Sequence, residues 1–269
     1  MTLNVSLRVP DGIVIASDSL ATLSEAISKK VNVESKCPKC AEAIQLKDVQ
    51  IPPFSIPSSS FPYAQKVFSL NGRLGLAAYG SSHLNGRSMY SHVTDLIAKL
   101  PKPSGNEDYV ETVKAAILEY FNKQIVLECN KTGFNLALAP DDWFPFGFQL
   151  AGFHRDANGE PLAKVFWIRM GKKSDAQPVA AQAFCTGDPS VVNLLWPGGT
   201  LTANVAAFSL QDAIDYAKFL IRTTSEYQRF SGKWQTVGGE IDIALITTRN
   251  GFQWIAQKQL YQMLERPAP

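Results

Sequence analysis

Three residue pairs typical of tight turns each separate two short apolar segments of this sequence. Asp11-Gly12, Asn71-Gly72 and Asn250-Gly251 each lie between segments with β-strand character. Residue pairs of this kind accept the positive φ values that tight hairpin turns require. The chain is therefore predicted to contain several antiparallel hairpins, the first over residues 3–16 and the last over residues 240–257.

Two helical segments are predicted between the second hairpin and the next strands. Ser81 or Ser82 is expected to cap a helix that runs to about Leu100, and Asn106 to cap a second helix over residues 107–129. In the second helix, apolar residues recur at helical spacing; they are Val110, Val113, Ile117, Phe121 and Ile125.

The rest of the chain alternates between the two kinds of element. Residues 146–154 and 162–170 favour paired strands, and residues 179–187 a further strand. Pro189 suits the first turn of a short helix, and Ser209 precedes a longer helix over residues 211–229. An order of strands, helices, strands, helices and strands is typical of segregated layers. The expected fold class is α+β, with two antiparallel sheets between helical layers.

The composition changes between residues 23 and 62, where Ser, Pro and Lys accumulate. The run IPPFSIPSSSFP gives little indication of regular structure. We therefore expect one large domain over residues 1–269, interrupted by a long surface insertion.

Metal and cofactor signals are weak. Cys37 and Cys40 have the spacing of one edge of a tetrahedral zinc site, but a closed structural site needs four ligands. Cys129, Cys185 and the three histidines are dispersed, so we predict no metal and no cofactor. A disulfide, or a zinc ion shared with a neighbouring subunit, remains open for the Cys37–Cys40 pair.

The four cysteines do not resemble the dense disulfide framework of a small secreted domain, which favours a cytoplasmic protein. The net charge is only +2, and Lys and Arg are scattered, which predicts neither a nucleic-acid nor an anionic membrane partner. No apolar run approaches ~18 residues, and the first residues lack the features of a signal peptide.

Three segments carry a resemblance to a known family. The opening TLNVSLRVPDGIVIASDS resembles the start of proteasome β subunits, and KVFSLNGRLGLAAYG resembles their segment with the catalytic Lys and the oxyanion-hole Gly. VGGEIDIALITTRNGFQWI is similar to their closing hairpin. The chain looks closer to bacterial proteasome homologues such as HslV and Anbu than to α subunits. The resemblance implies the four-layer α-β-β-α sandwich of N-terminal-nucleophile hydrolases.

The resemblance also assigns catalytic residues. Thr2 corresponds to the nucleophile, Asp18 to its carboxylate partner, Lys66 to the catalytic Lys and Gly80 to the oxyanion-hole Gly. Loss of Met1 would expose the Thr2 α-amine, whose pKa of about 7.7–8.0 suits a base for the hydroxyl. Buried beside Thr2, the Lys66 ammonium would keep the hydroxyl proton labile, and the Gly80 N–H would stabilise the oxyanion.

Two departures from the family pattern concern the supporting residues. The Gly-Ser-Gly-like segment of the family reads Cys185-Thr186-Gly187-Asp188 here, so Thr186 is expected to supply the hydroxyl. The usual Asp and Ser before the closing Gly-Gly are replaced by residues 234–237, which weakens the prediction of full proteolytic competence.

The expected function is that of a threonine-type endopeptidase that cuts unfolded polypeptide inside a homo-oligomeric ring. An ATP-dependent unfoldase is a fitting partner, because a closed chamber excludes folded substrates. Two alternatives remain: a catalytically inactive ring or binding protein with this fold, and an N-terminal-nucleophile amidase or acyl transferase that acts on small amides.

Overall fold

The computed structural model describes residues 2–27, 30–36, 40, 43–50, 54–103, 108–196, 203–232 and 234–258. The chain divides into two compact units. One comprises Met1–Ala21 with Pro62–Pro269, and the other is Thr22–Phe61.

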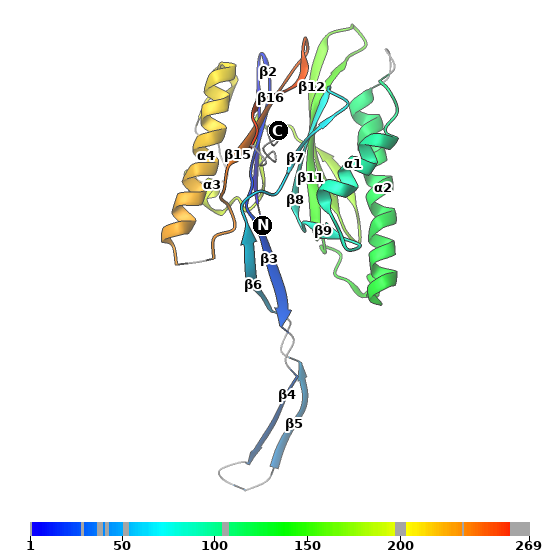
Figure 1. Ribbon diagram of the computed structural model, residues 1–269, viewed down its shortest axis with the longest axis vertical. Helices are drawn as coiled ribbons and strands as arrows, with labels where there is room; N and C mark the ends of the chain where they lie inside the picture. The colour runs from blue at the N-terminus through cyan, green and yellow to red at the C-terminus, as the bar shows by residue number, and fades with distance from the viewer. Residues whose placement is uncertain are drawn as a thin grey trace, which may run out of the picture. The chain divides into compact units, whose positions relative to one another are not determined.

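The larger unit contains a five-stranded antiparallel sheet built around the first hairpin. Its strand order is β14 (Ala183–Gly187), β1 (Leu3–Val9), β2 (Gly12–Asp18), β15 (Ile241–Thr247) and β16 (Gly251–Ala256). The first and last predicted hairpins, β1–β2 and β15–β16, are thus present and lie side by side (Figure 1). Their predicted turn residues are displaced, because Pro10 and Asp11 form the first turn and Gly12 and Gly251 already open β2 and β16.

A second five-stranded antiparallel sheet is built around the other predicted hairpins. Its order is β13 (Asp175–Pro178), β12 (Pro161–Met170), β11 (Phe146–Arg155), β8 (Leu74–Gly80) and β7 (Val67–Leu70). Asn71 and Gly72 adopt φ values of 51° and 66° in the β7–β8 turn, as a tight hairpin turn requires. The short edge strand β13 was not predicted.

Helices cover the outer faces of the two sheets (Figure 1). Helices α1 (Met89–Lys99) and α2 (Tyr109–Thr132) pack on the second sheet, and α3 (Ser190–Leu195) and α4 (Leu210–Phe230) pack on the first. Short 3-10 helices η1 (Leu136–Leu138) and η3 (Val205–Ala207) complete the unit. The facing sides of the sheets share an apolar cluster that includes Ile15, Ala77 and Ala151.

The predicted start of the first helix is wrong. Helix α1 begins at Met89, and Ser88 caps it by accepting a hydrogen bond from the Ser91 N–H. The preceding residues form a small hairpin of β9 (His83–Leu84) and β10 (Arg87–Ser88). Its turn, Asn85-Gly86, has positive φ at both residues, so an Asn-Gly pair outweighs the capping propensity of Ser81 and Ser82.

The other helices follow the predicted apolar pattern more closely than the predicted caps. All five apolar residues named for α2 are buried, but its cap is Asp108, and Asn106 lies outside the described residues. Ser209 caps α4 in a reciprocal capping box with Asp212. Pro189 stands at the N-cap of α3, one position before the expected one.

The smaller unit has more regular structure than predicted. It contains one pair of strands, β3 (Ala21–Ile27) with β6 (Phe54–Phe61), and a second pair, β4 (Lys30–Lys36) with β5 (Ala43–Gln50). Every strand of a two-stranded sheet is an edge strand, which is why β6 can contain Pro57. Cys40 is exposed, whereas Cys37 lies outside the described residues.

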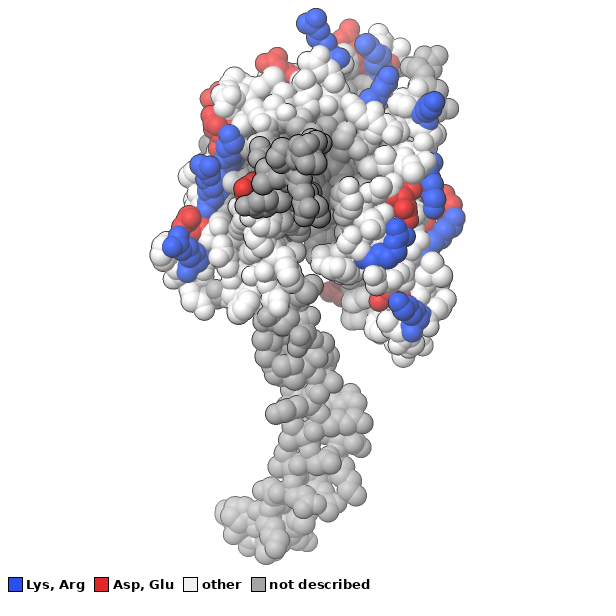
Figure 2. All heavy atoms as spheres, viewed as in Figure 1, with Lys and Arg blue, Asp and Glu red and all other residues white. Residues whose placement is uncertain are grey.

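Basic and acidic side chains alternate on the surface. On the face shown in Figure 2, Lys and Arg residues of the larger unit stand among Asp and Glu residues. Within the portion that the structure describes, no helix combines the length and apolar character needed to cross a membrane.

The larger unit is predicted to fold without the insertion, because one residue holds both ends of the break. Ser19 accepts a hydrogen bond from the Ala64 N–H at 2.9 Å and donates its hydroxyl to the Pro62 carbonyl at 2.6 Å. Replacing residues 23–60 with a short Gly-Ser linker should therefore change the free energy of unfolding by less than about 1 kcal/mol, since loop length has a weak effect on closure entropy. Chemical denaturation of both chains measures this, and loss of the cooperative transition would contradict it.

Candidate active site

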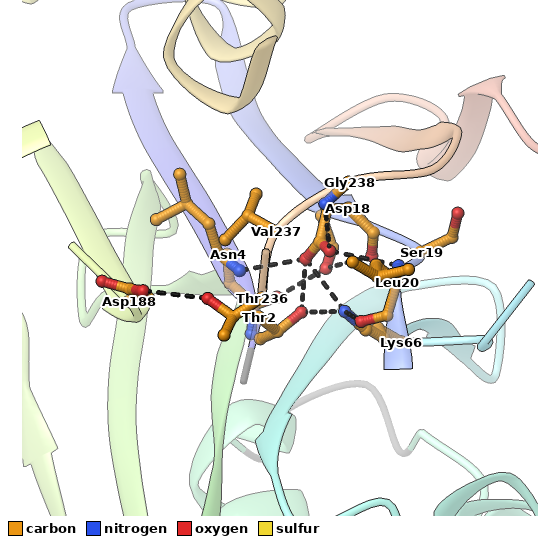
Figure 3. Close-up of polar contacts among 12 residues, drawn as sticks. Thr2, Asn4, Asp18, Ser19, Leu20, Lys66, Asp188, Thr236, Val237 and Gly238 are labelled. Carbon is orange, nitrogen blue, oxygen red and sulfur yellow. Dashed lines mark hydrogen bonds and ion pairs between the residues drawn. The ribbon is translucent and has the colours of Figure 1, made fainter. Parts of the chain in front are cut away.

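Three side chains that are distant in the sequence meet at one buried point (Figure 3). The Thr2 hydroxyl donates to Asp18 Oδ1 at 2.5 Å. Lys66 Nζ contacts the Thr2 hydroxyl and donates to Asp18 Oδ1 at 2.9 Å and to the Leu20 carbonyl at 2.7 Å. Thr2 is 2% exposed, Asp18 0% and Lys66 8%. The structure thus brings the predicted nucleophile, carboxylate and ammonium groups together.

The two sheets position these groups. Thr2 directly precedes β1 and Asp18 ends β2, so the antiparallel β1–β2 pairing brings them to the same end of the first sheet. Lys66 directly precedes β7 of the second sheet, where its carbonyl accepts from the Ala78 N–H at 2.9 Å. The site therefore lies where the two sheets adjoin.

Asp18 is the most completely bonded group of the site. In addition to Thr2 and Lys66, Asp18 Oδ1 accepts from the Leu3 N–H at 3.0 Å. Its Oδ2 accepts from the N–H groups of Leu20 at 3.1 Å and Gly238 at 3.0 Å. Hydrogen bonds to a charged group contribute about 1.5–3 kcal/mol each, so these donors fix the orientation of the carboxylate.

The protonation of Lys66 is shifted by its surroundings. Burial lowers the pKa of the Lys66 ammonium, and the Asp18 carboxylate opposes this shift without cancelling it. The pKa of Lys66 therefore lies below that of a solvated lysine, and its ammonium group is in contact with the Thr2 hydroxyl.

The segment after β14 holds the backbone of Thr2. The Asp188 N–H donates to the Thr2 carbonyl at 2.7 Å. Gly187 has a φ of 94°, and a Cβ atom there would lie 1.9 Å from the Thr2 carbonyl oxygen. Only glycine allows so close an approach.

Thr186 itself turns to a different partner. Its hydroxyl accepts from Gln149 Nε2 of the second sheet at 3.0 Å. No hydrogen bond found among the described parts of the chain joins the Thr186 hydroxyl to Thr2, Asp18 or Lys66.

Gly80 ends β8 opposite Phe146 and has a φ of 88°. A Cβ atom at Gly80 would lie 2.4 Å from the Pro145 carbonyl oxygen, so the position requires glycine. Helix α1 does not start directly after Gly80, as the predicted caps Ser81 and Ser82 would require, because the β9–β10 hairpin intervenes. A helix N-terminus therefore does not reinforce the Gly80 N–H.

A second polar cluster was missed by the sequence analysis. Asp188 Oδ2 accepts from the Thr236 hydroxyl at 3.0 Å (Figure 3). It also accepts from Gln228 Nε2 at 2.9 Å. Gln228 Oε1 accepts from the N–H groups of Thr236 and Val237, both at 2.9 Å. The next N–H, that of Gly238, donates to Asp18. Residues 236–238 thus connect Asp188, whose N–H bonds to the Thr2 carbonyl, with the Asp18 carboxylate.

This cluster contains a carboxylate, that of Asp188, and a hydroxyl, that of Thr236. These residues differ from the Asp and Ser that the family pattern places before the closing Gly-Gly. Burial raises the pKa of Asp188, but hydrogen bonds from Ser190, Thr236 and Gln228 outweigh it, so the pKa is lowered and the group is ionised at neutral pH. The available signals were the position of Asp188 directly after Thr186-Gly187 and that of Thr236 just before the Gly238-Gly239 pair.

The cysteines and histidines considered as metal ligands form no ligand cluster within the described ranges. No group of three His, Cys, Asp or Glu side chains with metal-binding geometry occurs in them. Cys129 is buried, and Cys185 lies on β14 in the first sheet.

Comparisons with known proteins concern the fold. No family model matches the sequence, and no curated protein matches it. A solved structure of the Gly-1 mutant of Anbu from Hyphomicrobium sp. strain MC1 is similar over 96% of this chain and 86% of that chain. The TM-score is 0.50 and the sequence identity 15%, which indicates a distant fold relationship.

The close approach of Gly187 to the Thr2 carbonyl predicts a specific effect of substituting Gly187. Gly187→Ala places a methyl group against the Thr2 carbonyl in addition to the strain of positive φ. Gly159→Ala is a matched control, because Gly159 has a φ of 83° with nothing within 4 Å of its Cβ position. We expect the control to lose about 1 kcal/mol of unfolding free energy, and Gly187→Ala to lose roughly 2 kcal/mol more. Equal losses in denaturant titrations would show that the contact is unimportant.

Proposed function

We propose that this chain is a threonine-type endopeptidase of the proteasome type, with Thr2 as its nucleophile after removal of Met1. The observation that carries the proposal is the buried Thr2 hydroxyl in contact with both Asp18 and Lys66. We infer further that the larger unit is the four-layer α-β-β-α sandwich of N-terminal-nucleophile hydrolases. The sheet topology, and the distant likeness to Anbu, one of the bacterial homologues that the sequence resembles, support this assignment.

The residues of the site suit acyl transfer. Thr2 Oγ1 attacks the carbonyl carbon of the substrate, and its proton passes to the α-amine of Thr2. The tetrahedral intermediate collapses, the amine returns the proton to the leaving nitrogen, and an ester with Thr2 remains. Water then hydrolyses this ester by the same proton transfers, which regenerates the hydroxyl.

Lys66 and Asp18 prepare the nucleophile. The ammonium of Lys66 stabilises negative charge that develops on Thr2 Oγ1. Asp18 fixes Lys66 through the ion pair of 2.9 Å and also accepts from the Thr2 hydroxyl in the resting state. The low exposure of all three side chains strengthens these electrostatic effects.

The backbone geometry supports Gly80 as the oxyanion donor. The Ala78 N–H bonds to the Lys66 carbonyl, so it points toward β7. In a strand, the N–H groups of residues two apart point to the same side. The Gly80 N–H is therefore directed toward the edge of β8 at which Lys66 lies, beyond the first residue of β7. Thr186 is proposed to support the site through its segment, which carries Gly187 and Asp188.

Assembly into a homo-oligomeric ring in the cytoplasm, with a polypeptide substrate and an ATP-dependent unfoldase, belongs to the same proposal. The outer face of α4 supports assembly, because Phe219, Tyr227 and Phe230 are 49%, 53% and 77% exposed there. Large apolar groups that recur on one exposed helix face are typical of protein interfaces.

Covalent labelling tests the proposed nucleophile. Intact mass is expected to show loss of Met1, and a peptide epoxyketone, which reacts with a hydroxyl and a free amine together, is expected to add once per chain at Thr2. Thr2→Ala should abolish labelling and Thr2→Ser should retain it, whereas Lys66→Met should slow it at least about 100-fold.

Matched controls separate these effects from general damage. Thr94→Ala on α1 and Lys123→Met, whose exposed side chain pairs with Glu119 on α2, should label at the wild-type rate. Undiminished labelling of Thr2→Ala would overturn the assignment. Retained Met1 would favour an inactive protein, and labelling without cleavage of polypeptides would favour an amidase or acyl transferase of small amides.

A further inference from the structure

A row of buried polar side chains crosses four strands of the first sheet beside the candidate site. The register pairs Thr186 of β14 with Asn4 of β1, Asn4 with Ser17 of β2, and Ser17 with Asp242 of β15. These residues are 4%, 0%, 0% and 0% exposed, respectively. Directly paired residues of antiparallel strands present their side chains on the same face, so the four form one continuous row.

The row faces the second sheet and is connected to Lys66. Ser17 donates to Asn4 Oδ1 at 2.7 Å, and Asn4 Nδ2 donates to the Ala78 carbonyl at 3.1 Å. The N–H of the same Ala78 donates to the Lys66 carbonyl at 2.9 Å. Hydrogen bonds thus link Ser17 and Asn4 to the backbone of Lys66, and Asp242 lies beside Ser17 in the register of the sheet.

Asp242 is part of a second buried ion pair. Lys258, which follows β16, bonds to Asp242 Oδ2 through its ammonium group and to Oδ1 through its N–H at 2.9 Å. Both side chains of this pair are 0% exposed. On β15, Asp242 is next to Ile241, which is paired with Asp18. Neighbouring strands are about 4.8 Å apart, so the backbones of Asp18 and Asp242 are close neighbours, and both carboxylates are fully buried.

We propose that Asp242 and Lys258 are positioning residues for the Thr2–Asp18–Lys66 site, which they serve by holding a balanced pair of charges beside Lys66. The inference rests on the proposed function for its catalytic meaning. Within the described part of the chain, the charged groups around Lys66 are Asp18 of β2, which bonds to it, and the buried pair of Asp242 on β15 and Lys258 after β16. The α-amine of Thr2 joins them once Met1 is removed.

Each member of the second pair acts on Lys66 in the opposite direction. Lys258 lowers the pKa of Lys66, and Asp242 raises it. The two effects oppose each other, so removal of either side chain would leave the other charge uncompensated near Lys66. The Asp242–Lys258 pair also joins the segment after β16 to the interior of the first sheet. The state of Lys66 thus depends on whether that segment is in place.

Titration of Lys66 itself tests the proposal without relying on catalysis. The full-length protein is labelled with ¹³C at lysine Cε, and the Lys66 resonance is assigned by its loss in Lys66→Met. Asp242→Asn leaves the Lys258 cation uncompensated, so the Lys66 midpoint should fall by about one pH unit. Lys258→Met leaves the Asp242 anion, so the midpoint should rise by about one unit. The double variant should return it to near the wild-type value.

The variants and controls give every outcome a meaning. Lys123→Met, which breaks an exposed pair on α2, should leave the Lys66 midpoint unchanged. Singly substituted proteins that fail to fold, beside a double variant that folds, would support the need for charge balance. Folded single variants with an unmoved midpoint, or unfolding of all three variants, would overturn the proposal. Absence of epoxyketone labelling in a wild-type protein whose variants show the opposed shifts would instead refute the peptidase function alone.

Discussion

The structure depends on the burial of one charge, the Asp18 carboxylate. An ionised carboxylate with no exposed surface is tolerated only when its oxygens are fully bonded. Its donors come from four separate stretches of the chain, residues 2–3, residue 20, residue 66 and residue 238. Because these stretches must converge on one side chain, the same interaction that assembles the site also joins the first sheet to the edge of the second. The fold and the candidate site therefore both depend on the complete hydrogen bonding of the Asp18 carboxylate.

This requirement explains where the chain tolerates a long insertion. Residues 22–61 depart between Asp18 and Lys66, the two members of the central ion pair. Ser19 bonds to both Pro62 and Ala64, so the path across the break is fixed before the chain reaches Lys66. These hydrogen bonds hold the two ends of the insertion together next to the site. The length of the insertion therefore has little effect on the position of Lys66 relative to Asp18.

Local signals accounted for much of the fold and less of the site. Asp-Gly and Asn-Gly turns and the apolar period of α2 act within a few residues, so hairpins and helices could be predicted. The same rule, applied to Asn85-Gly86, would have corrected the start of α1. Gln228, Thr236 and Lys258 gave no signal of their own, because their roles arise from partners far along the chain. Thr2, Asp18 and Lys66 were found only because their spacing resembled that of a family.

Buried polar groups are unevenly distributed within the larger unit. Apolar residues fill the outer layers and most of the space between the sheets, whereas the row of Thr186, Asn4, Ser17 and Asp242 crosses the first sheet at the end where Thr2 lies. Replacing a buried ion pair with well-packed apolar residues often increases stability, so stability alone does not account for such a row. Polar groups retained at a cost to stability are characteristic of functional sites. Asn4 of this row bonds to the Ala78 carbonyl, and the Ala78 N–H bonds to the Lys66 carbonyl, so the row adjoins the candidate site. Buried polar groups concentrated at that end of the sheet are what a site that controls one proton would require.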